Sequence, residues 1–153
     1  MTILVGGTPG GFEAHAALLG LLGRTLHVGP LGAGAAVKLA ANAAAISSLV
    51  GVAEVLTLTD RAGLDPGTVL DALGAGPLSS LIARWRDRIL DASGETNFRL
   101  ALARKDLELV LDEAGRVGIE LRVPGAAATR FDDALSAGRG EDDFSSVATS
   151  IRS

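Results

Sequence analysis

Residues 29–42 run Gly29-Pro30-Leu31-Gly32-Ala33-Gly34-Ala35-Ala36-Val37-Lys38-Leu39-Ala40-Ala41-Asn42. Glycine and proline at the start are typical of a turn, and the alanine-rich residues that follow favour a helix. No charged residue occurs from Leu39 to Ala53. The pattern therefore predicts one long helix from about Ala33 to Ala62, with a single lysine in its second turn.

The residues before this helix predict a short β-α-β unit. Thr2–Val5 is a β-branched and apolar run that ends at Gly6-Gly7, and Thr25–Val28 is a second expected strand that ends at Gly29-Pro30. Gly10–Leu22 between them has a helical pattern. Strands joined in this way run parallel with a right-handed crossover. Because parallel sheets are normally covered on both faces and contain more than two strands, residues 1–29 resemble the tail of a larger α/β sheet.

The residues after Pro30 predict helices only. Further helices are expected over Pro66–Leu73, Leu78–Leu90, Phe98–Val117, Pro124–Ala137 and from Asp143 to Ile151, with a polar loop over Asp91–Asn97. Asp65 and Asp143 are the expected N-caps of the helices that follow them, and Arg84, Arg86 and Arg88 are expected to be mostly solvated. The expected fold is mostly α: an all-helical domain over residues 30–153 around one long helix, preceded by the β-α-β remnant. The domain division is placed at Gly29-Pro30.

Composition excludes several classes of function. The net charge is −4 with a pI of about 5.1, and the basic residues are scattered, so we expect no nucleic-acid partner. The sequence has no cysteine and two distant histidines, so we expect no metal site. The uncharged run of the long helix is shorter than the roughly 20 residues of a membrane span. Without a charged leader before Thr2, the expected location is cytoplasmic.

Gly34, Lys38 and Asn42 are spaced four residues apart and therefore share one face of the helix. A lysine packed among alanines on such a face is a candidate catalytic acid or base. The alternatives are a lysine that extends to solvent at the edge of a helix bundle, which spacing alone favours, and a dinucleotide-binding loop. The second alternative is weak, because Val37 stands where the third glycine of that motif belongs.

The chain resembles the C-terminal part of the β-hydroxyacid dehydrogenase family, which includes 3-hydroxyisobutyrate dehydrogenase and tartronate semialdehyde reductase. The family pattern G-x-x-G-x-G-x-x-x-K-x-x-x-N is met from Gly29 to Asn42 with every spacing kept. Phe98 followed by Lys105-Asp106-Leu107 resembles a second family element, and Gly140–Ser145 resembles the closing G-x-x-D-x-S segment. The resemblance covers almost the whole chain.

This resemblance implies roles for five residues. Lys38 would be the catalytic acid/base, Asn42 and Gly34 would bind substrate, and Lys105 and Phe98 would contact the cofactor. It also implies NAD or NADP held mainly by a Rossmann domain of which residues 1–29 are the last β-α-β, a small hydroxyacid or semialdehyde substrate, and a homodimer. The chain alone is expected to be inactive.

Two other functions stay open at this stage. One is a non-catalytic helical dimerisation module, because the long helix and its small-residue faces suit self-association. The other is part of an imine reductase, although relatives of that type usually replace the lysine that Lys38 matches. Lys38 therefore favours a hydroxyacid or semialdehyde substrate.

Overall fold

The computed structural model describes residues 1–91 and 95–152, and it divides into two compact units, Met1–Asn42 and Ala43–Ser153. The division falls within one long helix, α2 (Ala33–Arg61). The predicted domain boundary at Gly29-Pro30 stays a prediction. The predicted polar loop at 91–97 includes residues 92–94, which lie outside the described residues.

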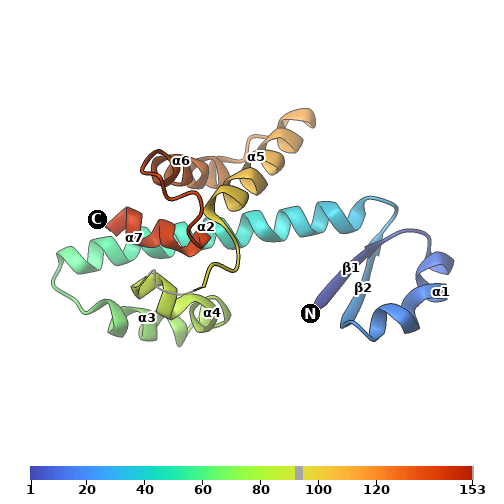
Figure 1. The fold of residues 1–153 in the computed structure, drawn as a ribbon, viewed down its shortest axis with the longest axis horizontal. Coiled ribbons are helices and arrows are strands. Elements are labelled where there is room, and N and C mark those ends of the chain that lie inside the picture. The colour runs from blue at the N-terminus through green and yellow to red at the C-terminus, as the bar shows by residue number, and fades with distance from the viewer. Residues whose placement is uncertain (92–94, 153) are drawn as a thin grey trace. The chain divides into compact units, whose positions relative to one another are not determined.

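The first unit contains the expected β-α-β unit, followed by the start of α2 (Figure 1). Strand β1 (Thr2–Gly6) pairs in parallel with β2 (Arg24–Gly29), and α1 (Pro9–Gly20) connects them. Thr8 caps α1 by accepting the backbone N–H of Gly11 at 3.1 Å, and Pro9 occupies the first turn. The parallel β-α-β prediction is thus confirmed.

A histidine on β2 holds the turn between β1 and α1. The ring of His27 stacks on Phe12 of α1 at 5.1 Å, and its Nε2–H donates to the carbonyl oxygen of Gly7 at 2.8 Å. These contacts fix the glycine-containing turn against the second strand.

The second unit is all-helical. Its elements are the remainder of α2, α3 (Pro66–Gly74), α4 (Ser79–Leu90), α5 (Leu100–Arg116), α6 (Arg122–Ser136), the 3₁₀ turn η1 (Phe144–Ser146) and α7 (Val147–Arg152). Asp65 caps α3 as predicted, by accepting the N–H of Thr68 at 2.7 Å. The mostly α fold class is confirmed.

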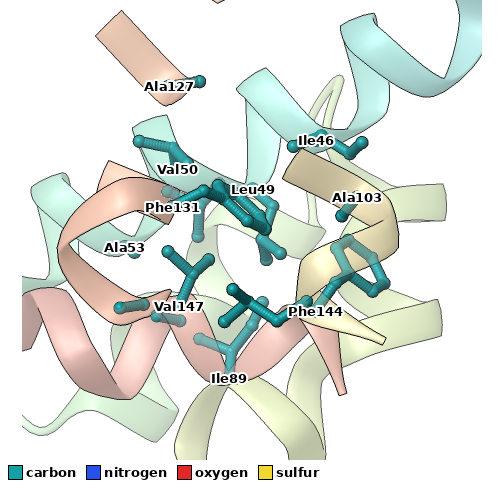
Figure 2. Packing of buried hydrophobic residues seen from close by; sticks show 14 of the residues in the cluster. Ile46, Leu49, Val50, Ala53, Ile89, Ala103, Ala127, Phe131, Phe144 and Val147 are labelled. Carbon is teal, nitrogen blue, oxygen red and sulfur yellow. The ribbon is translucent and has the colours of Figure 1, made fainter. Parts of the chain in front are cut away.

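The core of this unit is built from alanine, leucine, valine and isoleucine around a few aromatic rings. Figure 2 shows Ile46, Leu49 and Val50 of α2 beside Phe131 of α6, with Val147 of α7 close by. The core residues Leu49, Phe131 and Val147 are fully buried. Small residues in the core, such as Ala103 and Ala127, let neighbouring helices approach closely.

Helix α2 is the one helix among the described residues that is long and apolar enough to cross a membrane. Only 39% of that apolar window is buried in the structure, and the core helix of a soluble protein meets the same criterion. Seven α2 residues, all after Asn42, are buried, and they include Ile46, Leu49 and Leu56. The second half of α2 therefore serves as the core helix of the second unit.

Candidate functional site

Lys38 and Asn42 form a hydrogen-bonded pair on α2. The ammonium of Lys38 donates to Oδ1 of Asn42 at 2.5 Å, one helical turn further on. The four-residue spacing brings the two side chains together as predicted. Lys38 is exposed, however, and the alanines around it do not enclose it. The prediction that Lys38 is packed among alanines is wrong, because alanine side chains are too short to cover a lysine side chain.

Gly34 is required where α2 begins beside β1. A Cβ at Gly34 would lie 2.7 Å from the carbonyl oxygen of Leu4, and one at Gly6 would lie 2.6 Å from that of Pro30. Only glycine permits this approach between the end of the strand and the start of the helix. Gly6 has no role that follows from the sequence pattern alone, although a glycine pair at the end of an apolar strand signals close packing.

An open cleft of about 630 Å³ lies beside Lys38 within the first unit. Its lining comes from β1 and from the first turns of α2: Thr2, Leu4, Gly34, Ala35, Lys38 and Ala41. Small-molecule sites have volumes in this range, with mainly apolar walls and few polar groups. Lys38 is the only charged residue of the six, so the cleft suits a small anionic ligand.

Phe98 and Lys105 belong to the second unit. Phe98 is half-buried, and its ring lies 5.6 Å from the ring of Phe144 in an edge-on arrangement. It stands before α5, which begins at Leu100, so the predicted helix start at Phe98 is wrong. The backbone of Phe98 is held outside the helix by bonds to Asp143 and Phe144. Lys105 lies exposed on the second turn of α5.

Asp143 caps η1 as predicted, and it also accepts hydrogen bonds from α4 and from the residues before α5. Burial by itself raises the pKa of Asp143, but bonds from the hydroxyl and N–H of Ser145 and from the N–H groups of Asn97 and Phe98 outweigh it and lower this pKa below 3.8. The Arg88 guanidinium also donates to the carboxylate, at 2.8 Å. The prediction that Arg88 is mostly solvated is therefore wrong.

No cluster of three or more histidine or acidic side chains suited to a metal ion occurs within residues 1–91 and 95–152. The groups singled out from the sequence are the ammonium and amide pair of Lys38 and Asn42 in the first unit, and the ammonium and ring of Lys105 and Phe98 in the second.

The chain is similar to known dehydrogenases and reductases. Residues 32–151 match the family model described as the NAD-binding domain of NADP-dependent 3-hydroxyisobutyrate dehydrogenase. The 2-(hydroxymethyl)glutarate dehydrogenase of Eubacterium barkeri is 32% identical over 96% of this chain and 50% of its own length. Glyoxylate/succinic semialdehyde reductase 1 of Arabidopsis thaliana is 30% identical over 99% of this chain and 53% of its own length.

Solved structures agree on the fold. The 3-hydroxyisobutyrate dehydrogenase of Salmonella typhimurium aligns with a TM-score of 0.84 at 24% identity, over 94% of this chain and 52% of its own. The Mycobacterium tuberculosis 3-hydroxyisobutyrate dehydrogenase, solved with L-serine, aligns with a TM-score of 0.83 at 22% identity, over 99% and 55%. The chain spans about half the length of these relatives. By its matched residues, the chain belongs to the family of NAD-binding domains of 3-hydroxyisobutyrate dehydrogenases.

Proposed function

We propose that this chain is the C-terminal part of an NAD(P)-dependent oxidoreductase that interconverts a β-hydroxyacid and its semialdehyde or keto form. The observation that carries the proposal is the hydrogen-bonded pair of Lys38 and Asn42 beside an open cleft. The family match supports the reaction class and the cofactor. Relatives named as dehydrogenases or semialdehyde reductases support a small hydroxyacid or semialdehyde substrate.

Lys38 is proposed to act as the catalytic acid/base. In the reductive direction its ammonium donates a proton to the carbonyl oxygen of the substrate as that carbon gains hydride. In the oxidative direction the neutral amine takes the hydroxyl proton back. Asn42 accepts a hydrogen bond from Lys38 and thereby restricts its rotamers, and its amide is proposed to bind substrate as well. Gly34 leaves room for substrate in the cleft.

Two side chains of the second unit, Lys105 and Phe98, offer groups that can bind a dinucleotide. Such a cofactor offers phosphates and flat rings, and Lys105 supplies an exposed ammonium while Phe98 supplies a half-exposed aromatic face. When bound, NAD or NADP accepts or donates the hydride of the reaction. We assign Lys105 and Phe98 to hold it from the helical side.

The assembly and location are proposed with the function. A homodimer is supported by apolar side chains that α2 leaves exposed, notably Leu58 at 71% and Val55 at 46%. A cytoplasmic protein without nucleic-acid or membrane partners fits the scattered basic residues and the core position of the second half of α2. By itself the 153-residue chain is proposed to be inactive, because its sequence contains no complete G-x-G-x-x-G loop after a strand.

The test uses a completed enzyme, made by supplying the missing part from a relative. The chain is fused behind the part of the Eubacterium barkeri relative that it does not cover, and NADH and NADPH oxidation is measured with glyoxylate, succinic semialdehyde and a cyclic imine. We expect turnover of an aldehyde by this completed enzyme and none by the 153-residue chain. Lys38→Ala should lower turnover by about 10²-fold or more, the usual contribution of a general acid/base.

The controls separate the alternatives. Arg122→Ala removes an exposed cation whose ion-pair partner within residues 1–91 and 95–152 is the exposed Glu120, so it should leave turnover unchanged. A completed enzyme that folds and binds cofactor but turns over no aldehyde would reject the proposal. Preference for the imine would favour an imine reductase. Dimers of the chain without cofactor affinity in the completed protein would favour a dimerisation module.

A further inference from the structure

The N-terminus of α5 is capped by a distant segment of the chain. The N–H groups at the start of a helix have no partner inside it, and Arg99, the residue before α5, makes no side-chain capping bond. Instead the N–H of Leu100 donates to the carbonyl oxygen of Asp142 at 2.8 Å, and that of Ala101 donates to Gly140 at 3.1 Å. The point at which α5 begins is therefore fixed by the segment that precedes η1.

The carboxylate of Asp143 locks this arrangement. Its Oδ2 accepts from Arg88 of α4 at 2.8 Å and from the backbone N–H groups of Asn97 at 2.9 Å and Phe98 at 3.2 Å. Its Oδ1 accepts from the N–H of Ser145 at 3.1 Å and from its hydroxyl at 2.6 Å. One buried carboxylate thus joins α4, the residues before α5 and η1.

The ring of Phe98 is fixed by the same junction. The carbonyl oxygen of Phe98 accepts from the N–H of Phe144 at 2.7 Å, and the two rings meet edge-on. Phe144 in turn meets the ring of Trp85 of α4 at 5.4 Å. Lys105 follows on the second turn of the helix whose first turn is capped here, so the junction also sets where its side chain starts.

We propose that Asp143 is a positioning residue of the cofactor site, which fixes the start of α5 and thereby the placement of Phe98 and Lys105. The inference rests on the proposed function, from which it takes the cofactor contacts of those two residues. Asp143 itself does not touch the cofactor, because it is only 8% exposed and both of its oxygens accept bonds from the protein.

The first experiment measures amide hydrogen exchange in the 153-residue chain. Asp143→Asn keeps the shape of the side chain but loses its charge and one acceptor, so the amides of 97–101 should exchange roughly tenfold faster or more, while that of Leu107 changes little. The matched control is Glu141→Gln. It loses an exposed ion pair with Arg99, which also joins the residues before α5 to the segment before η1. Unchanged exchange at 97–101 in Asp143→Asn overturns the proposal.

Arg88→Gln replaces Asp143→Asn if the latter does not fold. It leaves the carboxylate in place but removes its charged partner from α4, and the same faster exchange is expected at 97–101. Circular dichroism at the exchange temperature confirms that either variant is folded. A folded Arg88→Gln chain with wild-type exchange at these amides also overturns the proposal.

The second experiment uses the completed enzyme and separates positioning from general stability. Asp143→Asn should raise the KM for NADPH or NADH roughly tenfold with kcat within about threefold, because misplaced contacts weaken cofactor binding first. In a Lys105→Ala background the same substitution should raise KM clearly less, since the two changes act through one contact. Equal effects in both backgrounds mean a merely structural role and overturn the proposal.

The two proposals fail in different ways. If the completed wild-type enzyme is inactive, or if Lys105→Ala leaves KM unchanged, the proposed function or its cofactor contacts fail, and the positioning proposal falls with them. If Lys105→Ala raises KM but Asp143→Asn does not, the cofactor contacts stand and only the positioning proposal is overturned.

Discussion

The guanidinium of Arg88 donates to the carboxylate of Asp143 at 2.8 Å, although 55 residues separate the two in the chain. Asp143 is buried and Arg88 is three-quarters buried, so this pair is unlike an exposed ion pair such as Arg116 with Glu113. A buried carboxylate is costly unless it is paired and hydrogen-bonded, and here its contacts join three parts of the second unit: α4, the residues before α5, and η1.

Arg88→Met should destabilise the chain strongly. It removes the cation and leaves a buried carboxylate without its charged partner, a change that costs about 3 kcal/mol. Chemical denaturation of the 153-residue chain measures the loss. Arg99→Met is the matched control: its ion pair with Glu141 is exposed, and losing it should cost less than about 1 kcal/mol. Equal losses for the two variants would show that the Arg88 pair is no stronger than a surface pair.

Asp143 should also make the fold sensitive to acid. Its folded pKa lies below the ordinary value of 3.8, so the ionised form stabilises the fold above that value. This contribution should fade as the pH falls from about 3.8 through the lower folded pKa. Thermal unfolding at several pH values between 2 and 5 should show a steeper loss of Tm for wild type than for Asp143→Asn. Parallel slopes would contradict this prediction.

Ser146 should be replaceable by alanine with a gain in stability. Its hydroxyl is buried and has no hydrogen-bond partner within residues 1–91 and 95–152. A buried hydroxyl without a hydrogen-bond partner lowers the stability of the fold by about 1–3 kcal/mol. Ser146→Ala should therefore raise the free energy of unfolding by about 1 kcal/mol. Ser145→Ala is the matched control, because it removes the hydroxyl that donates to Asp143 and should destabilise instead. Denaturation that ranks the two variants in the opposite order would refute the assignment.

The sequence predicted the elements better than the contacts between them. Local signals, such as the proline after Asp65 and the glycines around Pro30, placed most helices and both strands within a few residues. The start of α5 was missed because the Asp143 network, 45 residues away from Phe98, overrides the helical pattern there. The prediction of a solvated Arg88 fails for the same reason: helical spacing shows which residues share a face, not which distant charge pairs with them.

The candidate site was predictable only where its geometry is local. Lys38 and Asn42 meet because they are one helical turn apart, which the sequence states directly. Gly6 approaches the start of α2 through the packing of a strand against a helix, a relationship that no spacing in the chain encodes. The roles of Lys105 and Phe98 came from resemblance and stay predictions.

Gly34→Ala should weaken the first unit. The added Cβ would lie 2.7 Å from the carbonyl oxygen of Leu4, so α2 must move away from β1. A forced shift of this kind costs about 1–3 kcal/mol, and the amides of β1 should exchange faster. Gly51→Ala tests the same chemical change at a site of α2 with open space, and it should stabilise by roughly 0.5–1 kcal/mol. Destabilisation by both variants would indicate that helix position, not contact with Leu4, decides the effect.

Asn42 should act partly through Lys38. In the completed enzyme, Asn42→Ala releases the Lys38 ammonium from the bond that holds it and should lower kcat about tenfold, less than the roughly 10²-fold expected for Lys38→Ala. Because part of the Asn42 effect passes through Lys38, the loss of kcat in the double variant should be smaller than the two single losses combined. Ser48→Ala, which removes an exposed hydroxyl further along α2, is the control and should not change kcat. Additive losses in the double variant would mean that Asn42 contributes by contacting substrate alone, with no part in holding the lysine.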